Sequence, residues 1–540
     1  MTVSYFLGVD VGTGSVRAGL FDAAGALCGT GRHPIRMWRE AGDIAEQSSE
    51  DIWQAVCRSV RGACATAGVD GGAIAGIGFD ATCSLVVVGP GGAPLAVGDG
   101  PAERNVIVWM DHRATAEARA INATGHPVLD YVGGAISPEM QTPKLLWLKQ
   151  HRPASFAGAW QFFDLADYLG WRATGSLARS TCTVTCKWTY LAHEQRWDES
   201  YFRTIGLGVL ADEHFARIGT EIVEPGTSLG GLGAAAAAEL GLAPGTPVGA
   251  GLIDAHAGGI GTVGSGGGLG SIASRLAYVM GTSACTMAST DRPAFVPGVW
   301  GPYYSAMVPG LWLNEGGQSA AGAAIDRLVR CHPAFGEAAA LAKAGGVDTV
   351  AWLAAEAGAQ SETPSAAARL AGRLHVVPDF LGNRSPLADP AARAVIAGLD
   401  MDESLPSLLG LYIAGICALG YGLRQIVEAQ QPQGVVTQAI VISGGAGQSD
   451  LVRQLLADAT SLPVAIPATD EPVLLGSAML GAVAGGVHAT LGAAMTAMSH
   501  IAHTVRPAAG FGRLHEGRYR SFLRLQQAAA ELGRNDEDLT

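Results

Sequence analysis

The sequence is poor in charge and in aromatic side chains. Charged residues make up 15% of the 540-residue chain and aromatic residues 6%, whereas hydrophobic residues make up 48%. Disordered chains have the opposite balance, so this composition is typical of a well-packed globular enzyme. Because the chain exceeds the usual size of one domain, we expect two or three domains that each bury a core.

An excess of positive charge is also missing. The formal net charge is −13 at pH 7. Non-specific nucleic-acid binding needs clustered Lys and Arg that displace phosphate counterions, so we expect no nucleic-acid partner. A nucleotide is not excluded, because a phosphate needs only local positive dipoles.

The cysteines show no paired spacing, and the N-terminus lacks a basic region. The nine cysteines are scattered and odd in number, which argues against a disulfide framework. Cys182 and Cys186 precede His193, but the spacing matches no common zinc site. We interpret these thiols as reduced, which indicates a cytoplasmic location. Asp10 interrupts the first apolar run, which is therefore interpreted as a strand rather than a signal peptide.

Residues 472–499 contain no Asp, Glu, Lys or Arg. This length would span a bilayer, but the segment consists largely of Gly, Ala, Ser and Thr and includes His488. Small residues let helices approach closely, so we expect a buried helix pair and no membrane partner.

The start of the chain has a strand and turn pattern. Residues 5–33 alternate strand, Gly-rich turn, strand, turn and strand. A helix is predicted over 49–67, with Ser48 or Ser49 as its cap.

A similar opening is repeated in the second half. Residues 275–290 have a strand, a Gly-Thr-Ser turn and a strand, followed by a hairpin and by a helix that starts near Gln318. We therefore expect an internally duplicated α/β fold with a cleft between lobes over 1–262 and 263–540. The Gly-rich run 257–270 is interpreted as the crossover between them.

A Gly-rich turn follows the first expected strand. In GVDVGTGSVRAG (8–19), Asp10 ends the strand, and Thr13 and Ser15 lie in the turn. Backbone N–H groups and hydroxyls of such a turn can hold a terminal phosphate and its Mg²⁺, with Asp10 facing the metal through water. The spacing fits neither a P-loop nor a dinucleotide fingerprint, and a plain structural turn is the alternative.

The second half contains a comparable turn. In VMGTSACTM, Gly281, Thr282 and Ser283 form a hydroxyl-bearing turn between two strands. Two such turns, one opening each half, are what a phosphate chain clamped between lobes requires.

A third glycine turn follows a later apolar strand. In VISGGAGQSD (441–450), Gly444 and Gly445 have no side chain, which lets a base or ribose approach the backbone. Ser449 or Asp450 is expected to cap the next helix. A plain strand-to-helix turn is the alternative.

One acidic residue stands alone among small residues. In GAGLIDAHAGGIG (249–261), Asp254 has no Arg or Lys within ten residues on either side. A carboxylate in a cleft there is a candidate general base for a hydroxyl, and a helix N-cap is the alternative.

Taken together, these stretches resemble the FGGY carbohydrate kinases, over nearly the whole chain and in order. GVDVGTGSVRAG is similar to the first phosphate motif of that family, VMGTSACTM to the second and VISGGAGQSD to the adenosine motif. The resemblance implies an α/β fold with two actin-like (ribonuclease H-like) lobes and a catalytic cleft between them. It also implies an ATP- and Mg²⁺-dependent kinase of a small sugar or polyol, and homodimers are usual among related kinases. The implied cofactor-binding residues are Asp10, Thr13, Ser15, Gly281, Thr282, Ser283, Gly322, Gly444, Gly445, Ala446 and Ser449.

Other stretches are similar to the ribulokinases within this family. These are ISPEMQTPKLLWL, CKW, IDAHAG, NEGGQSAAG and WMDHR. FDATCSLV departs from the L-ribulokinase version and resembles the TCSLV-bearing subgroup, which acts on D-ribulose. The resemblance thus implies phosphorylation of D-ribulose to D-ribulose 5-phosphate, with Asp254 as the base. The implied sugar-binding residues are Thr82, Cys83, Ser84, Trp109, Asp111, His112, Glu139, Lys187 and Glu315.

Alternatives remain for the residues and for the function. Trp109 is equally compatible with a core aromatic, and Glu139 and Glu315 with surface carboxylates or caps. The substrate alternatives are ribitol, L-ribulose, xylulose and glycerol. A non-catalytic nucleotide-binding regulator and a Gly/Ala-rich scaffold are the alternatives to an enzyme.

Overall fold

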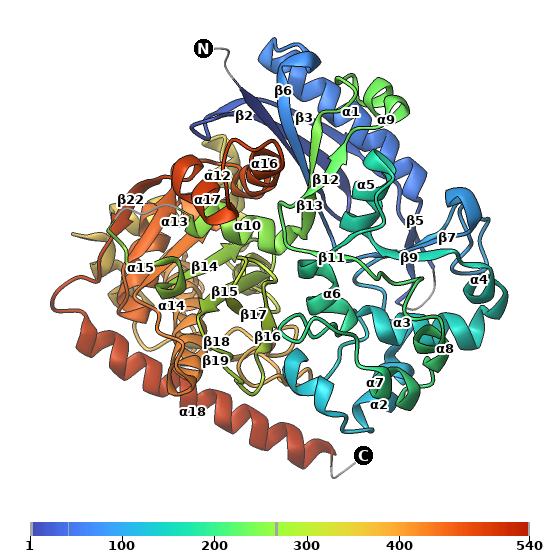
Figure 1. Ribbon diagram of the computed structural model, residues 1–540. Coiled ribbons are helices and arrows are strands. Elements are labelled where there is room, and N and C mark those ends of the chain that lie inside the picture. The colour runs from blue at the N-terminus through green and yellow to red at the C-terminus, as the bar shows by residue number, and fades with distance from the viewer. Residues whose placement is uncertain (1–3, 41–42, 265–267, 538–540) are drawn as a thin grey trace.

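The first large sheet is built from strands of the N-terminal half. The computed structural model describes residues 4–40, 43–264 and 268–537. β1 pairs antiparallel with β2 and parallel with β6, and β13 is parallel to β6. The sheet therefore combines the expected N-terminal meander with two parallel strands (Figure 1). In spatial order its six strands are β12 (Ser228–Gly231), β13 (Pro247–Ile253), β6 (Ile74–Ala81), β1 (Tyr5–Val11), β2 (Ser15–Asp22) and β3 (Leu27–Pro34).

The second large sheet repeats this arrangement. Its central strand β14 pairs antiparallel with β15 and parallel with β20, and β21 is parallel to β20. The repetition of hairpin and parallel strands confirms the predicted duplicated α/β fold. In spatial order the seven strands are β16 (Trp300–Tyr304), β17 (Trp312–Gln318), β15 (Ala284–Thr290), β14 (Arg275–Met280), β20 (Ala439–Ser443), β21 (Val464–Pro467) and β22 (Ile501–Val505).

Three smaller sheets and the helices surround these two sheets. The smaller sheets are β4–β5–β8–β7–β9 (Trp38–Arg39, Ala45–Gln47, Val106–Ile107, Leu85–Val88 and Gln161–Asp164), β10–β11 (Arg179–Ser180 and Ile222–Val223) and β18–β19 (His375–Val377 and Val395–Ala397). The helices of the first half are α1 (Ser49–Ala67), α2 (Thr115–Asn122), α3 (Gln141–His151), α4 (Pro153–Gly158), α5 (Leu165–Thr174), α6 (Thr181–Trp188), α7 (Glu199–Thr204), α8 (Gly208–Asp212), α9 (Ala234–Leu240) and α10 (Asp254–Val263). Those of the second half are α11 (Gly322–Arg330), α12 (Phe335–Ala344), α13 (Thr349–Ala359), α14 (Leu405–Gln430), α15 (Asp450–Thr460), α16 (Pro472–Ala484), α17 (Leu491–Met498) and α18 (Gly512–Glu537).

Helix α1 forms where the sequence predicts it. Ser48 is the N-cap and its hydroxyl accepts a hydrogen bond from the backbone N–H of Asp51 at 3.4 Å. Ile52, Val56 and Val60 are buried on one face, as the helical spacing requires. The helix that was expected near Gln318 begins slightly later, at Gly322.

The Gly-rich run 257–270 is not the irregular crossover that we expected. Residues up to Val263 belong to the buried helix α10, and residues 265–267 lie outside the described part. Glycine is needed here for close packing rather than for flexibility: a methyl group at Gly261 would overlap the carbonyl oxygen of Pro472 in α16. Helix packing therefore overrides the weak helix propensity of glycine.

The charge-free segment 472–499 forms helices α16 and α17, as predicted, and Leu474–Ala482 is largely buried. Although α16 belongs to the second half of the chain, it packs on β1 and β6 of the first sheet and on α10 (Figure 1). A side chain at Gly8, Gly76 or Gly78 would overlap a backbone carbonyl of α16. Small residues on both surfaces thus let this helix lie directly against the sheet.

Helix α14 is long and apolar enough to cross a membrane by length and composition. However, 78% of its apolar window is buried inside the protein. It forms part of the core of the second lobe with Leu455 and Leu456 of α15 and Phe522 of α18. Its hydrophobicity is therefore accounted for by this core.

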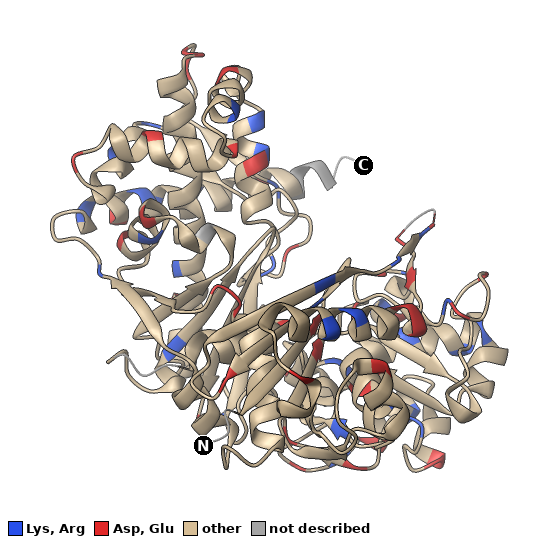
Figure 2. Cartoon of the chain, turned by 90° about the horizontal axis from the view of Figure 1, so that it is seen from above, with Lys and Arg blue, Asp and Glu red and all other residues tan. Residues whose placement is uncertain are grey.

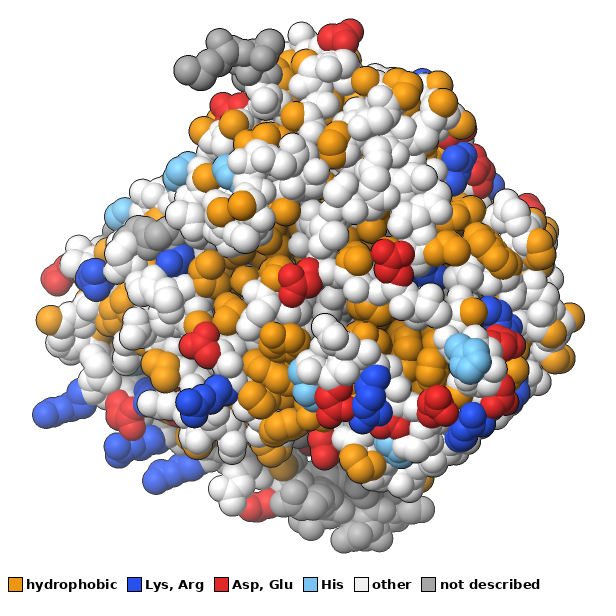
Figure 3. Space-filling view, viewed as in Figure 1, with side chains coloured by type: hydrophobic (Ala, Val, Ile, Leu, Met, Phe, Trp, Pro, Cys, Tyr) orange, Lys and Arg blue, Asp and Glu red, His pale blue; other side chains and the backbone are white. Residues whose placement is uncertain are grey.

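Charged residues are spread over both lobes. In Figure 2, acidic and basic positions are interspersed along the chain. On the face seen in Figure 3, acidic and basic side chains are mixed, and several basic ones gather at the lower left. The absence of a nucleic-acid partner stays a prediction.

The contact between α10 and α16 gives a test of the packing. A methyl group at Gly476 would overlap the carbonyl oxygen of Ala257. We expect Gly476→Ala to lower the free energy of unfolding by about 1–3 kcal/mol, because the two backbones must separate. Urea denaturation followed by circular dichroism measures the change.

Gly492→Ala is the matched control. Gly492 lies in α17, and nothing lies within 4 Å of a methyl group added there. Because alanine favours helix more than glycine does, we expect this variant to be unchanged or more stable by up to about 1 kcal/mol. Equal stability of the two variants would contradict the packing argument.

Candidate active site

Three carboxylates meet where parallel strands of the first sheet end. Asp10 and Asp80 are paired neighbours near the ends of β1 and β6, and Asp254 directly follows β13. Ligands of open α/β sheets bind beyond the carboxyl ends of such strands. A cleft of about 440 Å³ lies there, and residues of both lobes line it.

The structure brings most of the predicted site residues to this cleft. They come from strand ends, turns and helices that are far apart in the sequence. The predicted residues that line it are Asp10, Thr13, Ser15, Thr82, Cys83, Trp109, Glu139, Lys187, Asp254, Gly281, Thr282, Ser283 and Glu315.

The first Gly-rich turn connects β1 and β2 and is held by hydrogen bonds. The indole N–H of Trp109 donates to the hydroxyl of Thr13 at 3.0 Å, and the side chain of Gln47 donates to the Thr13 carbonyl at 2.8 Å. Trp109 therefore lines the cleft and also orients the turn through this hydrogen bond.

Arg17 connects this turn with the second half of the chain. Its guanidinium donates to Asp10 at 2.5 and 3.0 Å and to Glu471, the N-cap of α16, at 2.6 Å. Two carboxylates thus neutralise this cation, and it holds Asp10 in place.

Asp254 lies in the wall of the cleft, as the first residue of α10. Its carboxylate accepts a hydrogen bond from the backbone N–H of Ala255 at 2.7 Å. Burial, followed by the negative charge of Asp10, raises the pKa of Asp254 to about 6. The group is therefore ionised at neutral pH while it remains basic enough to accept a proton.

Opposite charges form the inner end of the cleft. The ammonium group of Lys187 lies 4.9 Å from the centre of the Trp300 ring. Burial opposes its charge, but Cys83 and Glu315 outweigh burial and raise the pKa of Lys187. Since burial raises the pKa of Cys83 to about 12, its thiol is neutral at pH 7, and Glu315 is the negative charge here.

Buried hydrogen bonds through His256 connect Glu315 with Cys182. His256 lies 3.3 Å from the Glu315 carboxylate through Nε2 and 3.1 Å from the sulfur of Cys182 through Nδ1. Burial would raise the pKa of Glu315, but Lys187 and the bond to His256 lower it to about 2. Glu315 is thus a fixed anion rather than a surface carboxylate.

Three residues expected in the sugar pocket lie outside this cleft. The hydroxyl of Ser84 accepts from the backbone N–H of Trp109 at 3.1 Å. The fully buried carboxylate of Asp111 pairs with Arg113 at 2.7 Å, and His112 is 42% exposed and lies 3.6 Å from Glu139. Ser84 and His112 therefore contact residues that line the cleft, whereas Asp111 pairs with Arg113 away from it.

A second pocket of about 960 Å³ adjoins the first in the second lobe. Gly281 and Thr282 line both cavities. Three further residues predicted to bind the cofactor, Gly322, Gly445 and Ser449, also line it.

The third turn contains two further predicted residues, Gly444 and Ala446. Gly444 has φ +93°, and a side chain there would overlap the carbonyl oxygen of Met280, so this glycine serves the turn and its packing on β14. Ala446 lies in the same turn, but its side chain is outside the described part of the structure. Ser449 caps α15, as expected.

The sequence analysis missed several residues of the cleft. Among them are Arg17, Cys285, Trp300 and Arg384. Arg17 carried a signal, because it is a charge inside an apolar strand. Arg384 lies in an irregular segment and carried none.

The carboxylates of the cleft suit a Mg²⁺ ion that binds together with the phosphates of a nucleotide rather than to the protein alone. Within the described residues, no group of three or more His, Cys, Asp and Glu side chains is arranged to hold a metal ion by itself. Mg²⁺ keeps several waters and binds through one or two carboxylates together with substrate phosphates. Asp10 beside the turn fits that pattern.

Comparison with known proteins agrees with this geometry. The relatives include an FGGY carbohydrate kinase domain-containing protein of Danio rerio, 46% identical over 98% of both chains. They also include a D-ribulokinase of Saccharomyces cerevisiae, 39% identical over 89% of this chain and 72% of that protein. The solved structure of a xylulose kinase from Rhodospirillum rubrum superimposes with a TM-score of 0.79 at 21% identity, over 98% of this chain and 100% of that one.

The family descriptions cover most of the sequence. Residues 5–261 match the N-terminal domain of the FGGY family of carbohydrate kinases, and residues 276–485 match its C-terminal domain. The chain is therefore a sugar kinase that uses ATP, and it belongs to the FGGY family of carbohydrate kinases.

Proposed function

We propose that this enzyme phosphorylates a ketopentose, D-ribulose, to D-ribulose 5-phosphate. The observation that carries the proposal is the place of Asp254, in one cleft with the two Gly-rich turns and with Lys187 and Glu315. The similarity to a D-ribulokinase supports this choice of sugar. A non-catalytic regulator is no longer an alternative, because the family is one of kinases.

ATP would bind mainly in the second lobe. The pocket beside Gly445 and Ser449 would take the adenosine, and Gly281 and Thr282 join that pocket to the cleft. The terminal phosphate would then lie between these residues and the turn that contains Thr13. Bound Mg²⁺ would neutralise charge on the phosphates, with Asp10 as its protein partner through water.

The sugar would occupy the cleft beside Lys187 and Glu315. Ammonium and carboxylate groups can bond the carbonyl and hydroxyl oxygens of a ketose, and Trp300 offers an apolar ring face. Asp254 would accept the proton of the attacking primary hydroxyl and orient it. Because phosphoryl transfer depends largely on positioning and charge stabilisation, the turns should matter as much as the base.

L-Ribulose, ribitol, xylulose and glycerol are the alternative substrates. The stereochemistry of the sugar is decided by a few hydrogen bonds, so related kinases with one fold take different substrates. A cytoplasmic location, a homodimer and the lobe boundary at residue 262 stay predictions.

The substrate assignment is tested with a panel. We expect D-ribulose to give the highest kcat/KM among D-ribulose, L-ribulose, ribitol, D-xylulose and glycerol in a coupled ADP-release assay. A higher kcat/KM with another compound would replace the sugar but keep the kinase. No stimulation of ADP release by any of the five would contradict the proposed function.

The assignment of the base is tested with Asp254→Asn. The variant cannot accept the proton, so we expect kcat to fall by about 10²–10⁴-fold while ATP binding is largely kept. Asp130→Asn, a change at an exposed carboxylate, serves as the control and should leave kcat unchanged. Near-normal turnover of Asp254→Asn would show that another group is the base.

The pH dependence gives a further test. Because the pKa of Asp254 is about 6, the carboxylate is protonated below pH 6, and kcat/KM for the sugar should fall there about tenfold per pH unit. Asp10 contributes to raising this pKa, so Asp10→Asn should move the acid limb to lower pH, whatever its effect on the maximal rate. An acid limb that does not move would argue against Asp254 as the titrating base.

A further inference from the structure

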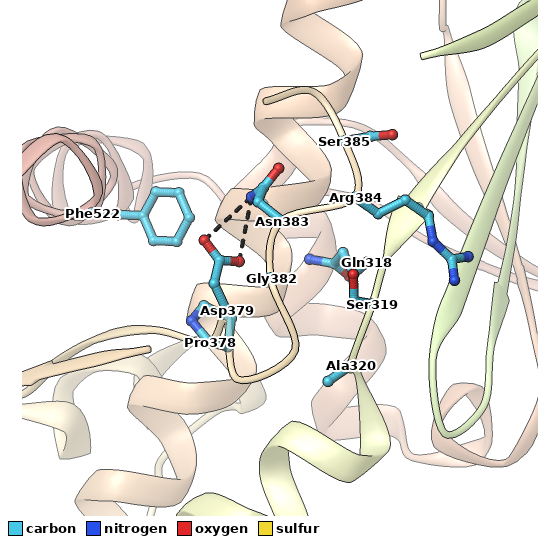
Figure 4. Close-up of a pocket in the computed structure, with 12 residues that line it drawn as sticks. Gln318, Ser319, Ala320, Pro378, Asp379, Gly382, Asn383, Arg384, Ser385 and Phe522 are labelled. Carbon is cyan, nitrogen blue, oxygen red and sulfur yellow. Dashed lines mark hydrogen bonds between the residues drawn. The ribbon is translucent and has the colours of Figure 1, made fainter. Parts of the chain in front are cut away.

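One arginine of the second lobe extends into the cleft from an irregular segment. Arg384 lies between β18 and β19 and lines the same cavity as Asp254. In Figure 4 its side chain extends away from Asp379 and Asn383, toward the yellow-green strands of the second sheet. Neither the motifs nor the proposed mechanism uses this residue.

The segment on both sides of Arg384 is tied to the second lobe. The Asn383 amide donates to the Asp379 carboxylate at 3.3 Å, and the Ser385 hydroxyl donates to the carbonyl of Gly298 at 3.0 Å. The backbones of Asn383 and Asp389 exchange two hydrogen bonds at 2.8 Å. The backbone of Arg384 is therefore held by its neighbours, so its side chain is presented to the cleft from a fixed position.

The guanidinium group has weak partners within the protein. Nη1 lies 3.8 Å from the sulfur of Cys285, and the guanidinium carbon lies 5.9 Å from the centre of the Trp300 ring. Among the described residues, no carboxylate lies within 4.0 Å of it. Arg17, in the same cleft, is by contrast neutralised by Asp10 and Glu471.

Arg384 is also placed near the sugar end of the cleft rather than its phosphate end. Trp300, which it approaches, is the ring beneath Lys187. Burial acts to raise the pKa of Glu139, but His112, Lys187 and Arg384 together lower it, so Arg384 is within electrostatic reach of a carboxylate of the opposite lobe. The guanidinium of Arg384 has five N–H donors, and in the cleft these need hydrogen-bond acceptors. The oxygens of a polyhydroxylated ligand are such acceptors.

We propose that Arg384 binds the ketose directly, donating hydrogen bonds to its hydroxyl or carbonyl oxygens from the second lobe. This inference rests on the proposed function. The first lobe contacts the sugar through Lys187 and Glu139. Arg384 joins Glu315 in contacting it from the second lobe. Sugar binding is thereby coupled to the approach of the two lobes, because the full set of bonds forms only when both lobes contact the ligand.

The test compares Arg384→Gln and Arg384→Lys with the wild-type enzyme, using the best sugar of the panel. We expect KM for the sugar to rise about 10- to 100-fold in Arg384→Gln, with a smaller rise in Arg384→Lys, because a hydrogen bond to a charged group is lost or weakened. KM for ATP should change less than about twofold. Arg393→Gln, at an exposed arginine of the same segment, is the control and should leave both constants unchanged.

Binding without turnover gives a second measurement. The sugar alone should raise the melting temperature of the wild-type enzyme and raise it less in Arg384→Gln, because ligand that binds only the folded state stabilises it. An unchanged sugar KM together with a raised KM for ATP would overturn the inference and assign Arg384 to the phosphates. Failure of the proposed function is distinguishable, because the wild-type enzyme itself would then show no sugar-dependent ADP release.

Discussion

The close packing of α10 against α16 positions the catalytic cleft. Glycines of each helix contact backbone carbonyls of the other, so the two helices cross at a separation that no larger residue permits. Asp254 is the first residue of α10, and Glu471, at the N-cap position of α16, accepts a hydrogen bond from Arg17. The position of the carboxylate and that of the first Gly-rich turn therefore depend on the same helix contact.

The charges of the cleft follow from this arrangement. Asp80, Asp10 and Asp254 lie too close together for all three to be ionised without cost, and burial, followed by Asp10, raises the pKa of Asp80 well above its usual value. Ser477 of α16 donates a hydrogen bond to Asp80. A neutral Asp80 leaves Asp10 paired with Arg17 and Asp254 ionised. Helix α16, which covers the first sheet, opposes the rise in the pKa of Asp80 through the hydrogen bond from Ser477.

The sequence predicted the parts of the fold and of the site that local patterns encode. The two strand-turn-strand openings, the cap of α1 and the buried helices α16 and α17 were predictable, because turn chemistry and apolar spacing act over a few residues. The helical state of 257–263 was not, because glycine favours coil until a partner helix from residue 472 onward packs against it.

The same distinction applies to the site. Asp10, Asp254 and the turn residues lie in motifs whose spacing has a physical meaning, and the structure brings them together. The buried pair of Asp111 and Arg113 could not be predicted. The sequence does not show whether a charged residue next to a pocket motif faces solvent, a ligand or another side chain. Arg384 reaches the cleft only through tertiary contacts.

The origin of α16 affects how the chain is made. The strands of the first sheet are complete on the ribosome once β13 has been synthesised, but the helix that covers β1 and β6 is encoded more than 200 residues later. At a synthesis rate of about 5–20 residues per second, this glycine-lined sheet surface stays uncovered for roughly ten seconds or more. The nascent first lobe should therefore depend on chaperones or remain incompletely packed until residues 472–484 emerge.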